Sequence, residues 1–125
     1  ARLSDRISTV SGNFISDALP RGADAILLAH IVTIWSPDRN IALLKKCHAT
    51  LPPGGVLLIV NMVSHDDERG PLLSALTSPN FQAIATRERM LYSGKDIEQW
   101  LRTAGFSTIS RSPLPMEHML FPAVR

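Results

Sequence analysis

The sequence contains two short apolar runs, Ala23–Val32 and Val56–Val63, on either side of a strongly marked helix. Each run is almost free of polar residues, which is typical of a strand buried on both faces of a parallel sheet. The helix start is indicated by Ser36 as a cap, Pro37 at the first helical position and Asp38 at the positive end of the helix dipole. Two parallel strands joined by a helix form a right-handed βαβ unit. We therefore expect an α/β fold with helices packed on a mostly parallel sheet.

Both predicted helices have clear ends and an apolar stripe. The first is stopped by the Pro-Pro-Gly-Gly run at 52–55. The second begins at Ser93, has Asp96 three residues later as in a capping box, and ends at Gly105. Apolar side chains recur at helical spacing at Ile41, Leu44, Cys47 and Leu51 in the first helix, and at Ile97, Trp100, Leu101 and Ala104 in the second.

Three further strands and a helical segment are predicted from weaker patterns. Arg6–Phe14 is short and β-branched, Phe106–Ser112 alternates, and Met116–Val124 forms a last strand. In that last strand, Pro122 indicates a break or an exposed end. The segment Pro71–Arg89 has the spacing of two short helices.

Composition excludes several classes of function. The formal charge of +2 comes from scattered basic residues, so no nucleic-acid partner is expected. No segment approaches the ~18 apolar residues that a membrane span needs. A single cysteine, Cys47, allows no internal disulfide and fits a reducing, cytoplasmic location. The acidic run His65–Glu68 is better interpreted as a solvated loop than as a metal site, because consecutive loop residues rarely share one coordination sphere.

Four motifs in a fixed order carry a family resemblance. They are VSGNF at Val10–Phe14, a long segment at Gly22–Ser36, LPPGGVLLIV at Leu51–Val60, and a capped helix at Tyr92–Phe106. Together they resemble the cofactor domain of caffeate-type and hydroxyindole-type O-methyltransferases and their bacterial natural-product relatives. The resemblance implies a class I methyltransferase with a partial Rossmann-like sheet. It also implies S-adenosyl-L-methionine bound at the carboxyl ends of the strands and a small, aromatic methyl acceptor.

The resemblance also assigns a cofactor region. In the family, the residues after the glycine of V-x-G-D-F cover the adenine, which here implies Asn13 and Phe14. Asn13 replaces the usual Asp, and Ala29 stands where the family often has a Lys. This uncharged pair is compatible with adenine binding, but the binding is expected to be weaker. Without the resemblance, Asn13 is better explained as a turn residue that stabilises the end of the strand.

The family's catalytic base is missing. The general-base His of the family falls on Thr33, and its two acidic partners fall on Asn61 and Leu91. None of these side chains titrates near neutral pH, as a general base must. His30 lies three residues before Thr33, so on a strand it would face the opposite side and is not expected to substitute.

Trp35 and Met90 lie near predicted strand ends and are candidates for the aromatic acceptor pocket. Two alternatives stay open for the function. The first is methyl transfer to the oxygen, nitrogen or ring carbon of an acceptor that needs no strong base, with positioning of the reacting atoms supplying much of the rate. The second is a non-catalytic α/β interaction module with a degenerate cofactor site.

We expect residues 1–125 to be the C-terminal portion of one cofactor-binding domain, lacking its first two strands. The family's glycine-rich turn holds the methionine end of the cofactor, and no G-x-G-x-G occurs in this sequence. The chain alone is therefore expected to bind S-adenosyl-L-methionine weakly or not at all. The longer parent is expected to be a homodimer, and the edge of Ala23–Val32 is expected to invite strand pairing.

Overall fold

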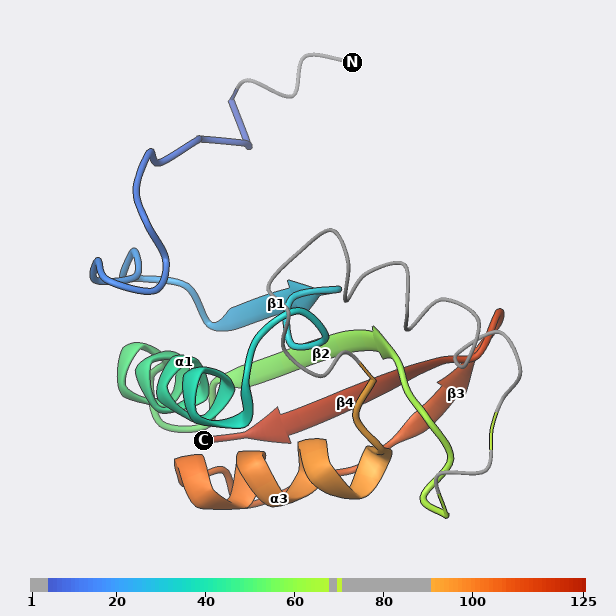
Figure 1. The fold of residues 1–125 in the computed structure, drawn as a ribbon. Coiled ribbons are helices and arrows are strands. Elements are labelled where there is room, and N and C mark those ends of the chain that lie inside the picture. The colour runs from blue at the N-terminus through green and yellow to red at the C-terminus, as the bar shows by residue number, and fades with distance from the viewer. Residues whose placement is uncertain (1–4, 68–69, 71–90) are drawn as a thin grey trace.

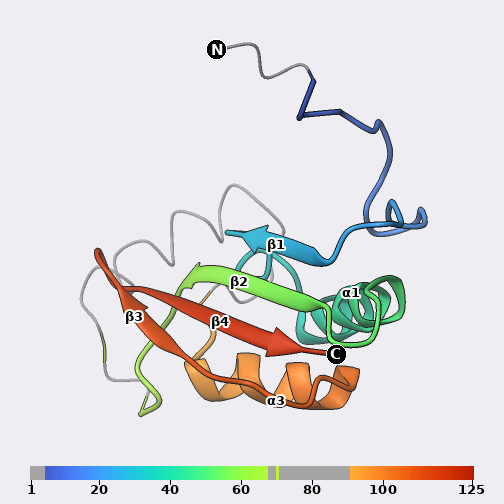
Figure 2. The same cartoon turned by 180° about the vertical axis from the view of Figure 1, so that it is seen from behind.

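A computed structural model describes residues 5–67, 70 and 91–125. Within these residues, four strands form one sheet in the order β1-β2-β4-β3. Figures 1 and 2 show the two helices side by side on one face of this sheet. The elements in chain order are β1 (Ala25–Ala29), α1 (Pro37–Thr50), β2 (Val56–Met62), α3 (Gly94–Ala104), β3 (Ser112–Leu114) and β4 (His118–Val124).

The predicted βαβ unit is confirmed. Strands β1 and β2 pair in parallel, from Ala25 opposite Val56 to Ala29 opposite Val60, and α1 connects them. Strand β1 is shorter than the apolar run that predicted it. The run turns out of the sheet at His30, whose φ of 55° is incompatible with an extended strand.

Strand β4 runs antiparallel to both β2 and β3, so three of the four strands point in one direction. Met116 and Glu117 have positive φ and form the turn of the β3–β4 hairpin, so β4 begins at His118 instead of Met116. The strand predicted at Phe106–Ser112 is wrong. In that segment only Ile109 makes a bridge to β4, and the regular strand starts at its last residue.

Pro122 marks neither a break nor an exposed end, because β4 is an interior strand and Pro122 lies opposite Leu58 within the ladder. Its carbonyl accepts a hydrogen bond from the amide of Ser110, on the side away from β2. In an antiparallel strand the amide and the carbonyl of one residue face the same neighbour. The missing N–H of Pro122 therefore faces the irregular segment before β3, and β2 loses no hydrogen bond.

The strand predicted at Arg6–Phe14 is also wrong. The described part of this segment is irregular, and Figure 1 shows it leading away from the sheet. Ile7 is 60% exposed and Val10 is 73% exposed. β-Branched residues favour a strand only where a neighbouring strand and a surface to cover are present. Among the described residues, no strand pairs with the outer edge of β1.

Both helices form as predicted. Helix α1 has Pro37 in its first turn, and α3 has the capping box of Ser93 and Asp96 and a left-handed Gly105 at its C-terminus. Their apolar stripes and the inner face of β2 and β4 make the core. Its fully buried large side chains include Leu44, Leu51, Leu57, Ile59, Ile97, Leu101 and Phe121. The two short helices predicted within 71–89 lie outside the described residues, and in the described part no helix could span a membrane.

Candidate functional site

Strands β1 and β2 end at the same edge of the sheet, and β4 begins there. Ligands of open α/β sheets bind outside the carboxyl ends of parallel strands, so this edge is the candidate site. The loop at 30–36 leads from β1 into α1 along this edge and carries two of the residues predicted from the sequence, Thr33 and Trp35.

The 30–36 loop is fixed by a buried amide. Asn40 is completely buried on α1, and its Nδ2 donates to the carbonyls of Val32 (2.8 Å) and Trp35 (3.1 Å). The Tyr92 hydroxyl donates to the same Trp35 carbonyl at 2.9 Å. Sequence reasoning missed Asn40, although a polar residue directly before Ile41 of the apolar stripe was the available signal.

His30 and Thr33 were expected to face opposite sides of a strand, and this expectation is wrong. Neither residue is in a strand, and the Thr33 hydroxyl donates to the His30 carbonyl at 3.5 Å within the turn. The rule of alternating faces therefore does not apply to this pair. The His30 ring instead meets the His118 ring edge-on, with 4.9 Å between their centroids.

His118 is the first residue of β4, and its contacts define its environment. Its Nδ1 lies 2.8 Å from the Met116 carbonyl, which can only accept, so Nδ1 is the donor of this hydrogen bond. His118 pairs with Met62 across the sheet, on the face opposite Asn61. The two histidines therefore do not join Asn61 in one catalytic cluster.

Asn61 lies near the end of β2, on the same face as the buried Leu57 and Ile59. The side chain is completely buried, and neither its Nδ2 nor its Oδ1 has a hydrogen-bond partner in the part of the chain that the structure describes. Leaving a buried amide unpaired costs about 1–3 kcal/mol, and a bound water or ion or a functional role can account for such a group.

Phe14 and Trp35 come together although they were predicted for different ligands. Their rings lie 6.1 Å apart in an edge-to-face arrangement, and the Arg39 guanidinium lies 5.3 Å from the centre of the Trp35 ring. The Trp35 Nε1 is buried and has no hydrogen-bond partner among the described residues. The predicted cofactor region and the predicted acceptor region are therefore adjacent.

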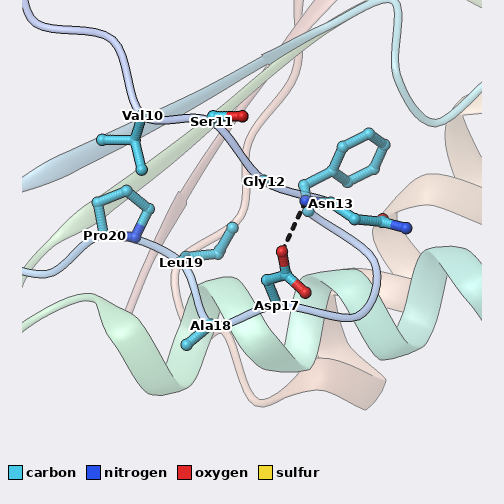
Figure 3. A pocket seen from close by; sticks show the side chains of 9 residues that line it. Val10, Ser11, Gly12, Asn13, Asp17, Ala18, Leu19 and Pro20 are labelled. Carbon is cyan, nitrogen blue, oxygen red and sulfur yellow. Dashed lines mark hydrogen bonds between the residues drawn. The ribbon is translucent and has the colours of Figure 1, made fainter.

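Asn13 starts a tight loop, residues 13–17, which we call the Asn13–Asp17 loop. Its Oδ1 accepts from the Ile15 amide at 3.0 Å, and its own amide donates to Asp17 Oδ2 at 2.8 Å, as Figure 3 shows. The hydrogen bond from the Asn13 backbone N–H holds the pKa of Asp17 below its usual range, and the Ser16 hydroxyl and the charge of Lys46 act in the same direction. These bonds support the role of Asn13 as a turn residue. One lone pair of its Oδ1 is left for a ligand.

A small open pocket lies beside this loop. Its volume is about 110 Å³, and Figure 3 shows the side chains that line it. Pockets for drug-sized ligands usually exceed about 300 Å³, so this one suits only part of a larger molecule. The pocket is lined by Val10, Ser11, Gly12, Asn13, Phe14, Asp17, Ala18, Leu19 and Pro20.

The other residues predicted from the sequence do not join the contact between Phe14 and Trp35. Ala29 is exposed at the end of β1, and Met90 lies outside the described residues. Asp66, from the acidic loop, pairs with Arg111 at 3.0 Å. Within 5–67, 70 and 91–125, no group of three or more His, Cys, Asp or Glu side chains could hold a metal ion.

Comparison with known proteins gives one consistent result. A family model described as O-methyltransferase domain matches residues 1–107. The L-tyrosine C(3)-methyltransferase of Streptomyces lavendulae is 40% identical over 92% of this chain and 32% of its own length. The 3-hydroxy-5-methyl-1-naphthoate 3-O-methyltransferase of Streptomyces sahachiroi is 38% identical over 87% of this chain and 31% of its own length.

The fold also matches that of a solved methyltransferase structure. The S-adenosylmethionine-dependent methyltransferase SibL, in its apo form, superimposes with a TM-score of 0.90 at 35% identity. The match covers 99% of this chain and 37% of SibL. The chain thus spans about a third of the length of the relatives it matches.

Proposed function

The chain belongs to the O-methyltransferase family, and on this premise we propose that it is the C-terminal portion of an S-adenosyl-L-methionine-dependent methyltransferase. The acceptor we propose is a small aromatic molecule. The relatives at 40% and 38% identity are named for methylation of a tyrosine carbon and a naphthoate oxygen, so both carbon and oxygen are acceptor atoms within this branch. The longer enzyme is proposed to be a cytoplasmic homodimer.

The observation that carries this proposal is the contact of Phe14 with Trp35. In this contact the loop that we propose for the adenine adjoins the loop that we propose for the acceptor, which supports a single site that holds both molecules. Phe14 is partly exposed and can cover a flat base, and Asn13 Oδ1 can accept from an exocyclic amino group. The residues described here therefore fit the adenine end of the cofactor.

When bound, S-adenosyl-L-methionine supplies a methyl group on a positively charged sulfur, which is open to in-line attack by a nucleophile. Thr33 does not remove a proton from that nucleophile, because its hydroxyl does not titrate near neutral pH. We propose that the loop at 30–36 acts by orientation, since Asn40 and Tyr92 hold its backbone rigidly. The acceptor would then arrive already nucleophilic, for example as a phenolate or an electron-rich ring carbon.

Calorimetric binding of S-adenosyl-L-methionine and S-adenosylhomocysteine tests the first part. We expect a longer protein that contains this sequence to bind both, and the 125-residue chain to bind weakly or not at all. Failure of the longer protein to bind either compound would remove the methyltransferase proposal and leave the non-catalytic interaction module.

A second experiment tests the absence of a base. In the longer protein, Thr33→Val should leave methyl transfer nearly unchanged, whereas loss of a true general base costs about 100-fold or more. Across a series of phenols, the pH midpoint of the rate should follow the pKa of each phenol. A single midpoint shared by all acceptors would indicate a base on the enzyme and would overturn this part of the proposal.

A further inference from the structure

Lys46 joins helix α1 to the Asn13–Asp17 loop in an unusual way. Its ammonium donates to three backbone carbonyls of that loop, those of Phe14 at 2.9 Å, Ile15 at 2.6 Å and Asp17 at 2.8 Å. An ammonium group has three protons, so this contact uses every donor that Lys46 has. Three carbonyls converge on one cation because the loop curls around it.

Few other contacts fix the loop against the rest of the molecule. Its internal hydrogen bonds, among Asn13, Ile15, Ser16 and Asp17, do not attach it to α1. The loop belongs to no helix or strand, and its residues are exposed. Besides Lys46, the Phe14 ring provides a contact with Trp35. The position of the loop relative to α1 therefore depends strongly on Lys46.

The neighbouring lysine offers a natural comparison. Lys45 is one residue earlier on the same helix, is exposed, and has no hydrogen bond or ion pair with the described residues. The two side chains have the same charge, length and helix propensity, but Lys46 points to the loop and is half-buried. Any effect that distinguishes them reports the loop contact and not the charge of the helix.

We propose that Lys46 is a positioning residue for the cofactor, which holds the Asn13–Asp17 loop so that Asn13 and Phe14 are in place for the adenine. This inference rests on the proposed function of that loop. Hydrogen bonds from a charged donor are stronger than neutral ones, and the three here restrict the loop to one arrangement. When only a fraction of molecules has the competent loop, the apparent dissociation constant rises in inverse proportion to that fraction.

The fold is expected to survive the loss of Lys46. The carbonyls that it contacts lie in an exposed loop, where water can hydrate them once the ammonium is gone. The effect of removing the side chain should therefore appear in the mobility of the loop and in cofactor affinity. The chemical step should be unaffected.

The test uses Lys46→Met, Lys46→Arg and the control Lys45→Met in the longer methyltransferase. We expect Lys46→Met to weaken binding of S-adenosylhomocysteine about tenfold and to raise KM for S-adenosyl-L-methionine equally, with kcat at saturation unchanged. Lys46→Arg, which keeps the charge and several N–H donors, should recover most of the affinity. Lys45→Met should match the unmodified protein.

Amide hydrogen exchange supplies a readout that needs no cofactor. In Lys46→Met, the protected amides of Asn13, Ile15 and Asp17 should exchange faster, while those of α1 keep their rates. If the exchange rates of the loop are unchanged, or if Lys45→Met weakens binding as much, the inference is wrong. If the unmodified protein binds no S-adenosylhomocysteine, the cofactor role of Lys46 falls together with the proposed function, and the exchange data alone still decide whether Lys46 holds the loop.

Discussion

At the scale of single residues, the junction between β1 and α1 depends on one buried amide. Asn40 supplies donors to two carbonyls in a place that water does not reach. Asn40→Ala should lower the free energy of unfolding by about 1–3 kcal/mol, because the buried Val32 carbonyl loses this donor while the Trp35 carbonyl keeps the Tyr92 hydroxyl. Urea denaturation measures this, with Lys45→Ala on the same helix as a control that should change little. A loss below about 0.5 kcal/mol for Asn40→Ala would contradict the role assigned to this amide.

Cys47 gives a second prediction at this scale, and it concerns pH. Burial raises the pKa of its thiol to about 11, against a small opposing effect of Lys46. The unfolded chain therefore loses the thiol proton first as pH rises. The stability that the neutral thiol contributes is complete below about pH 9 and is lost progressively toward pH 11, by about 1.4 kcal/mol per unit.

The pH dependence is measured by urea denaturation of the unmodified chain and of Cys47→Ala at several pH values. The stability difference between the two should shrink as pH rises above 9. At pH 8 the native thiol should react slowly with a disulfide reagent and rapidly after unfolding, because the thiolate is the reactive form. Equal rates in the native and unfolded states would show that Cys47 is not buried as the structure has it.

At the scale of elements, the two helices start with the same residue type in different ways. The Ser93 hydroxyl accepts from the Asp96 amide at 3.3 Å in a complete capping box, whereas Ser36 makes no side-chain cap bond. Ser93→Ala should therefore cost about 1 kcal/mol, and Ser36→Ala much less. Thermal and urea unfolding of the two variants give the comparison. Equal losses would mean that the hydroxyl bond does not stabilise α3.

The helices of this fold could be predicted from the sequence, and several strands could not. Both helices were found from local signals, since Ser36-Pro37, Ser93 with Asp96, and Gly105 act within a single turn. The strands at 6–14 and 106–112 were wrongly predicted, because a strand also requires a partner strand that local composition does not specify. The place of Pro122 in an interior strand likewise depends on which neighbour its missing N–H faces.

At the scale of the whole molecule, the candidate site was predicted in part. The family motifs located Asn13, Phe14, Thr33, Trp35 and Asn61 in sequence, and the structure brings Phe14 and Trp35 into contact. The residues that position these groups were missed. Asn40 contacts carbonyls only five and eight residues away, so its signal was local. Lys46 acts over a long range, because 29 to 32 residues separate it from the carbonyls of the loop it holds. No periodicity in the sequence reports contacts of that kind.

The outer edge of β1 gives the last prediction, which concerns association of the 125-residue chain by itself. In the described part of the chain no strand pairs with this edge, and Leu27 on β1 is 62% exposed. An unpaired edge with an apolar side chain is a template for pairing with a second chain. We therefore expect the mean mass of the isolated chain to rise with concentration in light scattering coupled to size exclusion.

A charge placed on the edge should oppose this pairing. Leu27→Lys is expected to return the chain to a monomer, since like charges on two apposed edges repel and the apolar contact is lost. Met116→Lys is the matched control, because Met116 is 75% exposed but lies in the turn between β3 and β4, at the other side of the sheet. If both variants reduce association equally, exposed apolar surface in general drives it. If the unmodified chain is monomeric at every concentration, the edge of β1 is protected, and the prediction of edge pairing is wrong.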